Sequence, residues 1–451
     1  MMQSGTSTGA TRQKPPSPKL PAAAQALRWI ARPYAFLAEC AREFGDVFAL
    51  EFGPNARYVI FSSPDDIREI FTAGANALRM GSGNAVLQPI LGKASLLLLE
   101  GEQHLRERRL LMPAFHQRAV GNYGALIQDA VVASTTHWRS GYAFVAQDVL
   151  QDVSIDVILR IVFGLKPGVQ CAELKRELVS LLNDPRLGLG LLAKLREASA
   201  HPSLNDFRKR FERVRELTDA VIAERRKAGL PPEDDILSML LEATDEKGVR
   251  RSDDEIRDEL LTLVVTGHET TATALSWGLY WISTHDEVQA RLRAELRGVS
   301  PADARALAAN EYLDGVCKEV LRICPIVPSV FREVVDHFSV AGYDFESGTV
   351  LSPSVYLTHH REDLYARSEE FNPERFTARS YSGYEYFPFG GGARRCIGMT
   401  LAVFEMKVIL SAIVGSFELE LEPGHKVYPT RRVATMAPFG GPRMRVRRRL
   451  C

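Results

Sequence analysis

The chain has 451 residues, of which 45% are hydrophobic and 25% are charged, so it has the composition of a globular protein with ample material for a large core. Its 56 Lys and Arg balance 56 Asp and Glu, and a formal net charge of zero argues against nucleic acid as a partner. No CxxC spacing occurs, which in a chain of this size favours a reducing, cytoplasmic compartment. The cysteines are Cys40, Cys171, Cys317, Cys324, Cys396 and Cys451.

The N-terminal segment is rich in Ser, Thr, Pro and Lys and contains no apolar run long enough for a signal peptide or a membrane span. We therefore predict a disordered segment over residues 1–25 and a single domain over residues 26–451. We also expect a cytoplasmic protein without a membrane anchor.

The N-terminal half of the chain is predicted to change early from strand to helix. Residues 46–61 indicate two strands around a Gly-Pro-Asn turn, and residues 64–71 indicate a helix. Residues 73–99 are rich in Gly and Leu with weak periodicity, so we predict a long loop there. A helix is predicted over residues 104–111, and the pattern between residues 120 and 300 is almost wholly helical.

The clearest helix is predicted to begin at Ser252, because Ser252 and Glu255 have the spacing of a capping box. Its middle, LLTLVVTGHETTATAL, is apolar on nearly every side, so this helix is expected to cross the interior of a large domain and to end near Ser283. Glu269 and Thr270 are therefore two polar groups in a region that should be dry.

The composition and the hydrophobic pattern of the sequence change towards the C-terminus. Residues 333–356 alternate and turn, which indicates a small sheet, and residues 366–395 are aromatic and rich in Pro and Gly. A second apolar helix is predicted from Cys396 to about Gly415, and residues 427–449 favour terminal strands. The fold class is therefore predicted to be mainly α with a minor β portion.

The segment Phe389-Gly-Gly-Gly-Ala-Arg-Arg-Cys396-Ile-Gly398 sets one cysteine apart from the others, for which a structural role is expected. Three glycines allow a close backbone approach to a flat ligand. The N–H groups of the following helix, with Arg394 and Arg395, favour a thiolate. Such a thiolate suits a nucleophile or a metal ligand. No His with an orienting acid lies nearby in sequence to serve as its base.

This segment is similar to the cysteine-ligand loop FxxGxRxCxG of the cytochrome P-450 superfamily at every fixed position. Three further motifs follow the family in the same order along residues 30–445. Thr266-Gly-His-Glu-Thr-Thr271 resembles the oxygen-activation motif, Glu319-Val-Leu-Arg322 resembles ExxR, and Phe371-Asn-Pro-Glu-Arg-Phe376 resembles the PERF segment. Together these motifs are specific, although each one alone is weak.

The resemblance implies a cytochrome P-450 fold in which haem b lies between the long central helix and the cysteine loop. Cys396 is then the axial ligand of the haem iron, and a thiolate in that position favours O–O cleavage. Phe389 and Gly398 are implied to line the cofactor. The donors to the haem propionates are implied to be His104, Arg108, Arg332 and Arg394. For His104 and Arg108 the alternative is a solvated basic helix, since Arg106 and Arg109 lie alongside.

Glu269 and Thr270 are implied to supply protons to dioxygen through ordered water. Gly267 is expected to let the helix open locally, and the alternative for Glu269 and Thr270 is a polar pair satisfied within the core. Glu319, Arg322 and Arg375 are implied to form a structural triad beneath the cysteine loop. By resemblance, the substrate pocket draws on mostly apolar positions, where a plain core is the alternative: Leu263, Thr266, Val327, Val330 and Phe439. Thr266 either hydrogen-bonds a substrate or narrows the pocket.

The resemblance therefore implies a monooxygenase that inserts one oxygen atom from O2 into a hydrophobic terpenoid, fatty acid or steroid-like compound. No flavin or iron–sulfur module follows the haem domain in this sequence, so electrons are expected from a separate ferredoxin and its reductase. We expect a monomer whose docking face includes Arg106, Arg109, Arg395 and Lys407. The alternatives are a peroxide-driven peroxygenase and a haem-thiolate sensor without turnover.

Overall fold

The structure is a computed structural model that describes residues 14–53, 56–74, 76–80, 84, 87–184, 205–228, 235–244, 248–432 and 435–450. The chain forms two compact units, each of which combines segments that are distant in sequence. The first joins Met1–Gly81 with Ser329–Thr358, and the second joins Ser82–Pro328 with His359–Cys451. The prediction of one domain over residues 26–451 stays a prediction.

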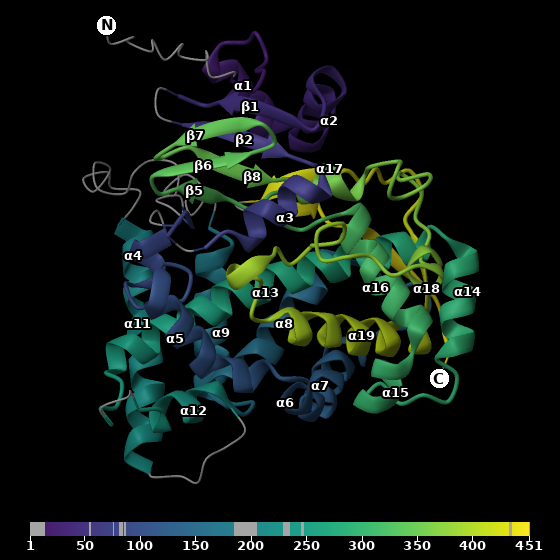
Figure 1. Cartoon of the computed structure of the whole chain (residues 1–451). Coiled ribbons are helices and arrows are strands. Elements are labelled where there is room, and N and C mark those ends of the chain that lie inside the picture. The colour runs from purple at the N-terminus through teal and green to yellow at the C-terminus, as the bar shows by residue number, and fades with distance from the viewer. Residues whose placement is uncertain are drawn as a thin grey trace, which may run out of the picture. The chain divides into compact units, whose positions relative to one another are not determined.

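The first unit is built around a sheet with the strand order β1-β2-β8-β5-β3 (Figure 1). β1 and β2 are antiparallel, β2 and β8 are parallel, and β5 is antiparallel to both β8 and β3. β6 and β7 form a separate antiparallel pair. The elements are α1 (Ala22–Ala31), α2 (Pro33–Phe44), β1 (Val47–Glu51), β2 (Arg57–Phe61), α3 (Pro64–Thr72), β3 (Leu78–Arg79), β5 (Arg332–Val334), β6 (His337–Val340), β7 (Tyr343–Glu346), β8 (Val350–Pro353) and α17 (Val355–His359), whose last residue belongs to the second unit.

The structure describes residues 14–25, while residues 1–13 lie outside the described residues, so the predicted disordered segment over residues 1–25 stays a prediction. The backbone N–H of Ala49 in β1 donates to the carbonyl of Pro16 at 2.7 Å. Buried Gln25 donates to the carbonyl of Leu20 and accepts from the N–H of Glu51. The composition of the segment concealed these backbone contacts, because they are made to a distant strand.

The second unit is mainly helical, and its small sheets are β4-β12-β9 and the hairpin β10–β11. Its helices are α4 (Gln88–Leu91), α5 (Gly101–Leu111), α6 (Gln117–Asn122), α7 (Gly124–Thr135), α8 (Ala146–Phe163), α9 (Val169–Leu182), α11 (Asn205–Ala228), α12 (Ile236–Glu242), α13 (Asp253–Ser283), α14 (Asp286–Glu295), α15 (Ala304–Ala309), α16 (Glu311–Ile323), α18 (Arg375–Ala378) and α19 (Met399–Ser416). Its strands are β4 (Ala143–Val145), β9 (Phe417–Leu421), β10 (Pro429–Arg432), β11 (Thr435–Pro438) and β12 (Arg443–Arg449).

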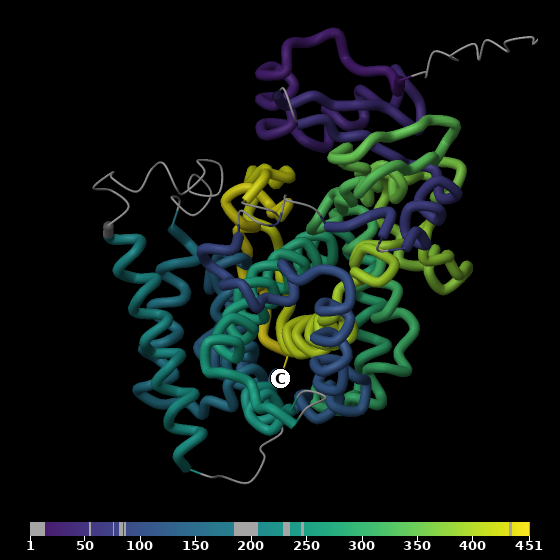
Figure 2. Tube along the Cα trace, turned by 60° about the vertical axis from the view of Figure 1, so that its left-hand side comes forward, coloured from purple at the N-terminus to yellow at the C-terminus, as the bar shows by residue number. Residues whose placement is uncertain are grey.

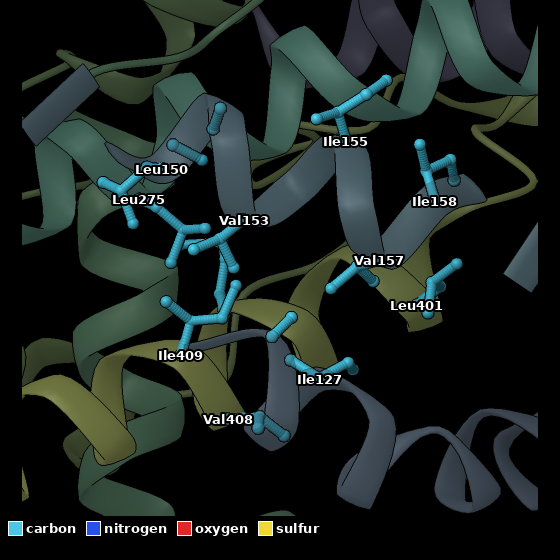
Figure 3. Packing of buried hydrophobic residues seen from close by; sticks show 14 of the residues in the cluster. Ile127, Leu150, Val153, Ile155, Val157, Ile158, Leu275, Leu401, Val408 and Ile409 are labelled. Atoms are coloured by element: carbon cyan, nitrogen blue, oxygen red, sulfur yellow. The ribbon is translucent and has the colours of Figure 1, made fainter. Parts of the chain in front are cut away.

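The long helix α13 has the predicted start, because Ser252 and Glu255 form a reciprocal capping box. It packs along α8 and crosses α19, and α7 packs against both α8 and α19. Figure 3 shows this layer of side chains, with Ile155 and Ile158 from α8, Leu401 and Ile409 from α19, and Leu275 from α13. In Figure 2, α19 is seen almost end-on among the helices of its unit. The prediction of a mainly α protein with a minor β portion is confirmed.

Several boundaries differ from the sequence prediction. The predicted loop over residues 73–99 contains β3 and α4, and strand β9 at Phe417–Leu421 was not predicted. Among the described residues, α19 is long and apolar enough to cross a membrane, but 67% of it is buried inside the protein. Burial within the fold accounts for its apolar character.

Candidate active site

The cysteine loop is closed by its own backbone. The N–H of Cys396 donates to the carbonyl of Phe389 at 3.0 Å, and the N–H of Arg395 donates to the carbonyl of Gly392 at 3.1 Å. Gly390 and Gly392 adopt φ angles of 68° and 66°, which residues other than glycine rarely adopt. Gly398 is the N-cap of α19. The glycines therefore form a tight turn that presents Cys396 at the start of a helix.

The Cys396 side chain is exposed, although protein atoms surround the thiol closely enough that burial raises its pKa. The N–H groups of Gly398 and Met399, with Arg108 and Arg395, oppose that effect by stabilising the thiolate. The exposed residue leaves Cys396 open to a ligand at the start of α19. A reachable sulfur backed by N–H donors has the chemistry of a thiolate metal ligand.

Two of the predicted propionate donors lie close to the cysteine. Arg108 on α5 is half-buried and interacts electrostatically with Cys396, and burial lowers its pKa. Burial also lowers the pKa of Arg394, which donates to the Leu99 carbonyl and to the Glu100 carboxylate at 2.5 Å. Each of these two guanidinium groups lies close enough to another arginine for repulsion to lower its pKa further. A doubly anionic ligand such as haem suits this cluster.

The other predicted donors have different surroundings. His104 lies on α5 one turn before Arg108 and is buried. Arg332 belongs to β5 in the first unit, where its Nη1 donates to the Phe331 carbonyl at 2.8 Å and contacts the Met80 sulfur at 3.2 Å. Its contribution to a haem site therefore stays a prediction.

Glu269 and Thr270 lie in the middle of α13 on a stretch that is only half-buried, between fully buried segments of the same helix. Gln151 Nε2 on α8 donates to Glu269 Oε2 at 2.7 Å, and Arg432 Nε on β10 lies 3.3 Å from Oε1. Burial raises the pKa of Glu269, while Arg432, Gln151 and Thr273 oppose that rise. A half-buried acid with a raised pKa inside a helix is a candidate for proton transfer.

A row of threonine hydroxyls runs along α13. Thr262 Oγ1 donates to the carbonyl of Asp258 at 2.6 Å, Thr266 Oγ1 to that of Thr262 at 2.7 Å, and Thr270 Oγ1 to that of Thr266 at 2.7 Å. The helix is continuous through Gly267, so the expected local opening there is absent. Gly267 instead makes room for Ile158, because a Cβ at this position would lie 3.0 Å from the Ile158 side chain.

Residues 92–99 are fastened to α13 by side chains that sequence reasoning did not select. Asp258 accepts from the N–H of Ala94 at 3.2 Å, Glu259 accepts from the N–H of Leu96 at 3.0 Å, and Thr262 contacts Ser95 at 2.8 Å. Burial raises the pKa of Glu259 to about 8. The signal in the sequence was the pair of adjacent acids Asp258 and Glu259 directly before the apolar middle of α13.

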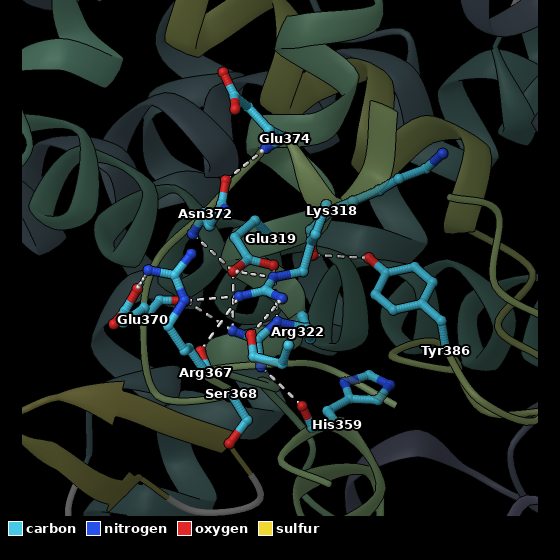
Figure 4. A network of polar contacts seen from close by, with 12 residues as sticks. Lys318, Glu319, Arg322, His359, Arg367, Ser368, Glu370, Asn372, Glu374 and Tyr386 are labelled. Atoms are coloured by element: carbon cyan, nitrogen blue, oxygen red, sulfur yellow. Dashed lines mark hydrogen bonds and ion pairs between the residues drawn. The ribbon is translucent and has the colours of Figure 1, made fainter. Parts of the chain in front are cut away.

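The triad of Glu319, Arg322 and Arg375 forms one buried network, which Figure 4 shows around Glu319 and Arg322. Glu319 accepts two hydrogen bonds from Arg322, one from Arg375 Nε at 2.9 Å and one from the N–H of Asn372 at 2.9 Å. Arg322 Nη1 also donates to the carbonyl of His359 at 2.8 Å. The network fastens α16 to the chain that leads towards the cysteine loop.

The predicted pocket residues differ in their exposure and surroundings. Leu263 is buried in the main core, and Thr266 is half-buried beside Thr270. Val327 is 36% exposed, and Val330 belongs to the first unit, where its N–H donates to the Pro353 carbonyl. Phe439 is half exposed and stacks on Tyr428 with ring centroids 4.8 Å apart. The pocket therefore stays a prediction.

Lys407 does not belong to a docking face, because it is buried on α19 and pairs with Asp314 at 2.7 Å. Arg106, Arg109 and Arg395 are exposed. Lys407 was expected on the docking face, whereas the Asp314 carboxylate on α16 compensates its charge inside the protein.

The comparisons identify the family. The family model for cytochrome P450 matches residues 15–438. Cytochrome P450 135B1 of Mycobacterium tuberculosis is 36% identical over 96% of this chain and 91% of its own length, and cytochrome P450 135A1 of the same species is 33% identical over 96% and 95%. The chain therefore belongs to the cytochrome P450 family, and it is a haem-thiolate monooxygenase.

Solved structures agree with this fold. Retinoic acid bound cyanobacterial CYP120A1 matches with a TM-score of 0.82 and 26% identity over 97% of this chain and 99% of that one. The heme domain of cytochrome P450DA matches with a TM-score of 0.84 and 23% identity over 97% and 98%, which shows the shared fold alone. The predicted cytochrome P-450 fold is confirmed.

Proposed function

We propose that this enzyme inserts one oxygen atom of O2 into an apolar small molecule at haem b held by Cys396. The observation that carries the proposal is the exposed Cys396 thiol at the start of α19, with two N–H donors behind it and Arg108 beside it. When bound, haem supplies oxygen activation, and a thiolate ligand favours O–O cleavage. The Arg108 and Arg394 guanidinium groups are the propionate donors, with His104 and Arg332 as further donors and Phe389 and Gly398 lining the cofactor.

Glu269 and Thr270 are the residues proposed to move protons. The Glu269 carboxyl is half-buried, and burial raises its pKa, which favours its role as a proton carrier for ordered water. Thr270 presents oxygen lone pairs, because its own proton is donated to the Thr266 carbonyl. An acid and an alcohol arranged in this way support oxygen activation over a peroxide-driven reaction or a sensor without turnover.

The proposed substrate is a terpenoid, fatty acid or steroid-like compound that contacts Leu263, Thr266, Val327, Val330 and Phe439. The neighbouring structure of CYP120A1 holds retinoic acid, an isoprenoid with a long apolar chain, which supports this class. A library of apolar compounds is the direct test, with binding measured as a shift of the Soret band. If only small polar compounds shift the band, the proposed class is wrong.

Electrons are proposed to come from a separate ferredoxin and its reductase, delivered to a cytoplasmic monomer. Exposed Arg106, Arg109 and Arg395 provide positive charge for an acidic partner. The function as a whole is tested by adding ferredoxin, reductase and a Soret-shifting compound. We expect consumption of reduced nicotinamide with formation of an oxygenated product, and no product from Cys396→Ser.

A further inference from the structure

Two consecutive residues of α13 are tied to one residue of α8. The side-chain amide of Gln151 donates from Nε2 to Glu269 Oε2 at 2.7 Å. The backbone carbonyl of the same residue lies 3.1 Å from His268 Nε2. Because a carbonyl can only accept, His268 carries its proton on Nε2. Gln151 therefore uses both its side chain and its backbone to hold the pair His268-Glu269.

The surroundings make this contact specific. Gln151 and His268 are both buried, and burial lowers the pKa of His268 to about 4, so the ring is neutral at pH 7. Arg432 is the charged group that approaches Glu269, and it lies at the other oxygen of the carboxyl group. Ser154, one turn further along α8, donates to the His268 carbonyl at 3.3 Å. These buried contacts thus hold the His268-Glu269 part of α13 in place against α8.

We propose that Gln151 is the positioning residue of Glu269, holding Oε2 and with it the orientation of the carboxyl group. This inference rests on the proposed role of Glu269. A hydrogen bond to an ionised carboxylate is stronger than one between neutral groups, so Gln151 also favours the charged form of Glu269. Loss of its N–H donor disorders the carboxyl group and raises the pH at which the group ionises.

The chain offers a matched control one turn earlier on α8. Gln147 is the same residue type and is also buried, but its side-chain amide has no hydrogen-bond partner among the described residues. Gln147→Met and Gln151→Met remove the same group from the same helix with the same change in shape. Gln151→Asn is a second test variant, because it keeps the amide but shortens the side chain by one methylene.

The first readout does not depend on turnover. The carboxyl stretch of Glu269 is assigned by infrared difference spectroscopy as the band missing from Glu269→Gln, and its titration midpoint is then measured. Gln151→Met and Gln151→Asn are expected to raise the midpoint by about one pH unit, whereas Gln147→Met leaves it unchanged. Equal midpoints in wild type and both Gln151 variants would overturn the proposal.

The second readout is the yield of product per nicotinamide consumed. Gln151→Met is expected to lower it several-fold in the wild-type background and to have no further effect in Glu269→Gln, as required of a residue that acts only through Glu269. If Glu269→Gln alone leaves the yield unchanged, the proposed role of Glu269 fails. If Glu269→Gln lowers the yield and neither Gln151 variant does, the positioning role fails while Glu269 keeps its role.

Discussion

Arg322 holds the Glu319 carboxylate with two parallel hydrogen bonds, from Nε to Oε2 at 2.7 Å and from Nη2 to Oε1 at 2.9 Å, and neither side chain is exposed. Arg375 and the N–H of Asn372 occupy the remaining acceptor capacity of Oε1. This carboxylate is therefore the point at which α16 and the segment preceding the cysteine loop are joined.

Glu319→Ala should destabilise the fold by about 3–5 kcal/mol, because it leaves the guanidinium groups of Arg322 and Arg375 buried without their carboxylate. That loss is a large part of a typical stability of about 5–15 kcal/mol, so poor soluble yield and little bound haem are expected. Lys318→Ala is the control, since the Lys318 side chain is 42% exposed and such a pair contributes at most about 1 kcal/mol. Normal haem content and unchanged melting in Glu319→Ala would contradict the proposed structural role.

Cys396→His should abolish the strongly red-shifted Soret band that a reduced thiolate–haem protein shows with carbon monoxide. An imidazole nitrogen donates less electron density to iron than a thiolate does, so the band should move to shorter wavelength. Carbon monoxide difference spectra of wild type, Cys396→His and Cys396→Ser check this result. The assignment of the ligand is wrong if either variant retains the wild-type band, and Cys324→Ser serves as the buried-cysteine control.

Thr270→Ala should bind haem and substrate as wild type does but release peroxide instead of product, because the hydroxyl oxygen beside Glu269 is lost. Thr270→Ser keeps the hydroxyl and should retain most of the product yield. Product and hydrogen peroxide are both measured per nicotinamide consumed. An unchanged yield in Thr270→Ala would remove this hydroxyl from the proton supply.

The burial of Glu405 on α19 predicts how the free energy of unfolding depends on pH. Burial raises the pKa of this carboxyl from 4.5 to about 8, and Ser154 is its hydrogen-bonding neighbour. The folded protein keeps a proton that the unfolded chain releases, so the free energy of unfolding should fall as the pH rises from 4.5 to 8. The fall is at most about 1.4 kcal/mol for each pH unit.

Glu405→Gln keeps the shape of the side chain but cannot ionise, so its unfolding curve should lack that part of the pH dependence. Denaturant unfolding at several pH values between pH 5 and 8 measures the difference from wild type. Exposed Glu102→Gln is the control and should run parallel to wild type. Parallel curves for wild type and Glu405→Gln would show that Glu405 ionises normally in the fold.

Local signals in the sequence were sufficient for the central helix and the cysteine loop. The capping box at Ser252 marks the start of α13, and the glycines before Cys396 mark a turn that few other residues can adopt. Both signals act within a few residues, so they can be recognised without knowing what packs around them.

Long-range partners could not be predicted in the same way. Gln151 and Arg432 reach Glu269 from positions far away in the chain, and a buried Gln or a strand Arg has no spacing that identifies its partner. Lys407 was misplaced for the same reason, since only the fold brings Asp314 next to it. The parallel pairing of β2 with β8 likewise depends on chain that is distant in sequence.

The threonine row of α13 has a consequence for which molecules can lie against it. A hydroxyl has a single hydrogen, and Thr266 and Thr270 have each committed theirs to a helix carbonyl. These two hydroxyl groups can therefore accept a hydrogen bond from another molecule but cannot donate one. An alcohol, an amine or a water finds a lone pair there, whereas an ether, ketone or ester finds no hydrogen unless a threonine first turns away from the helix. At Thr266 and Thr270 a hydroxylated compound would therefore find a hydrogen-bond acceptor, whereas its ketone would find no donor.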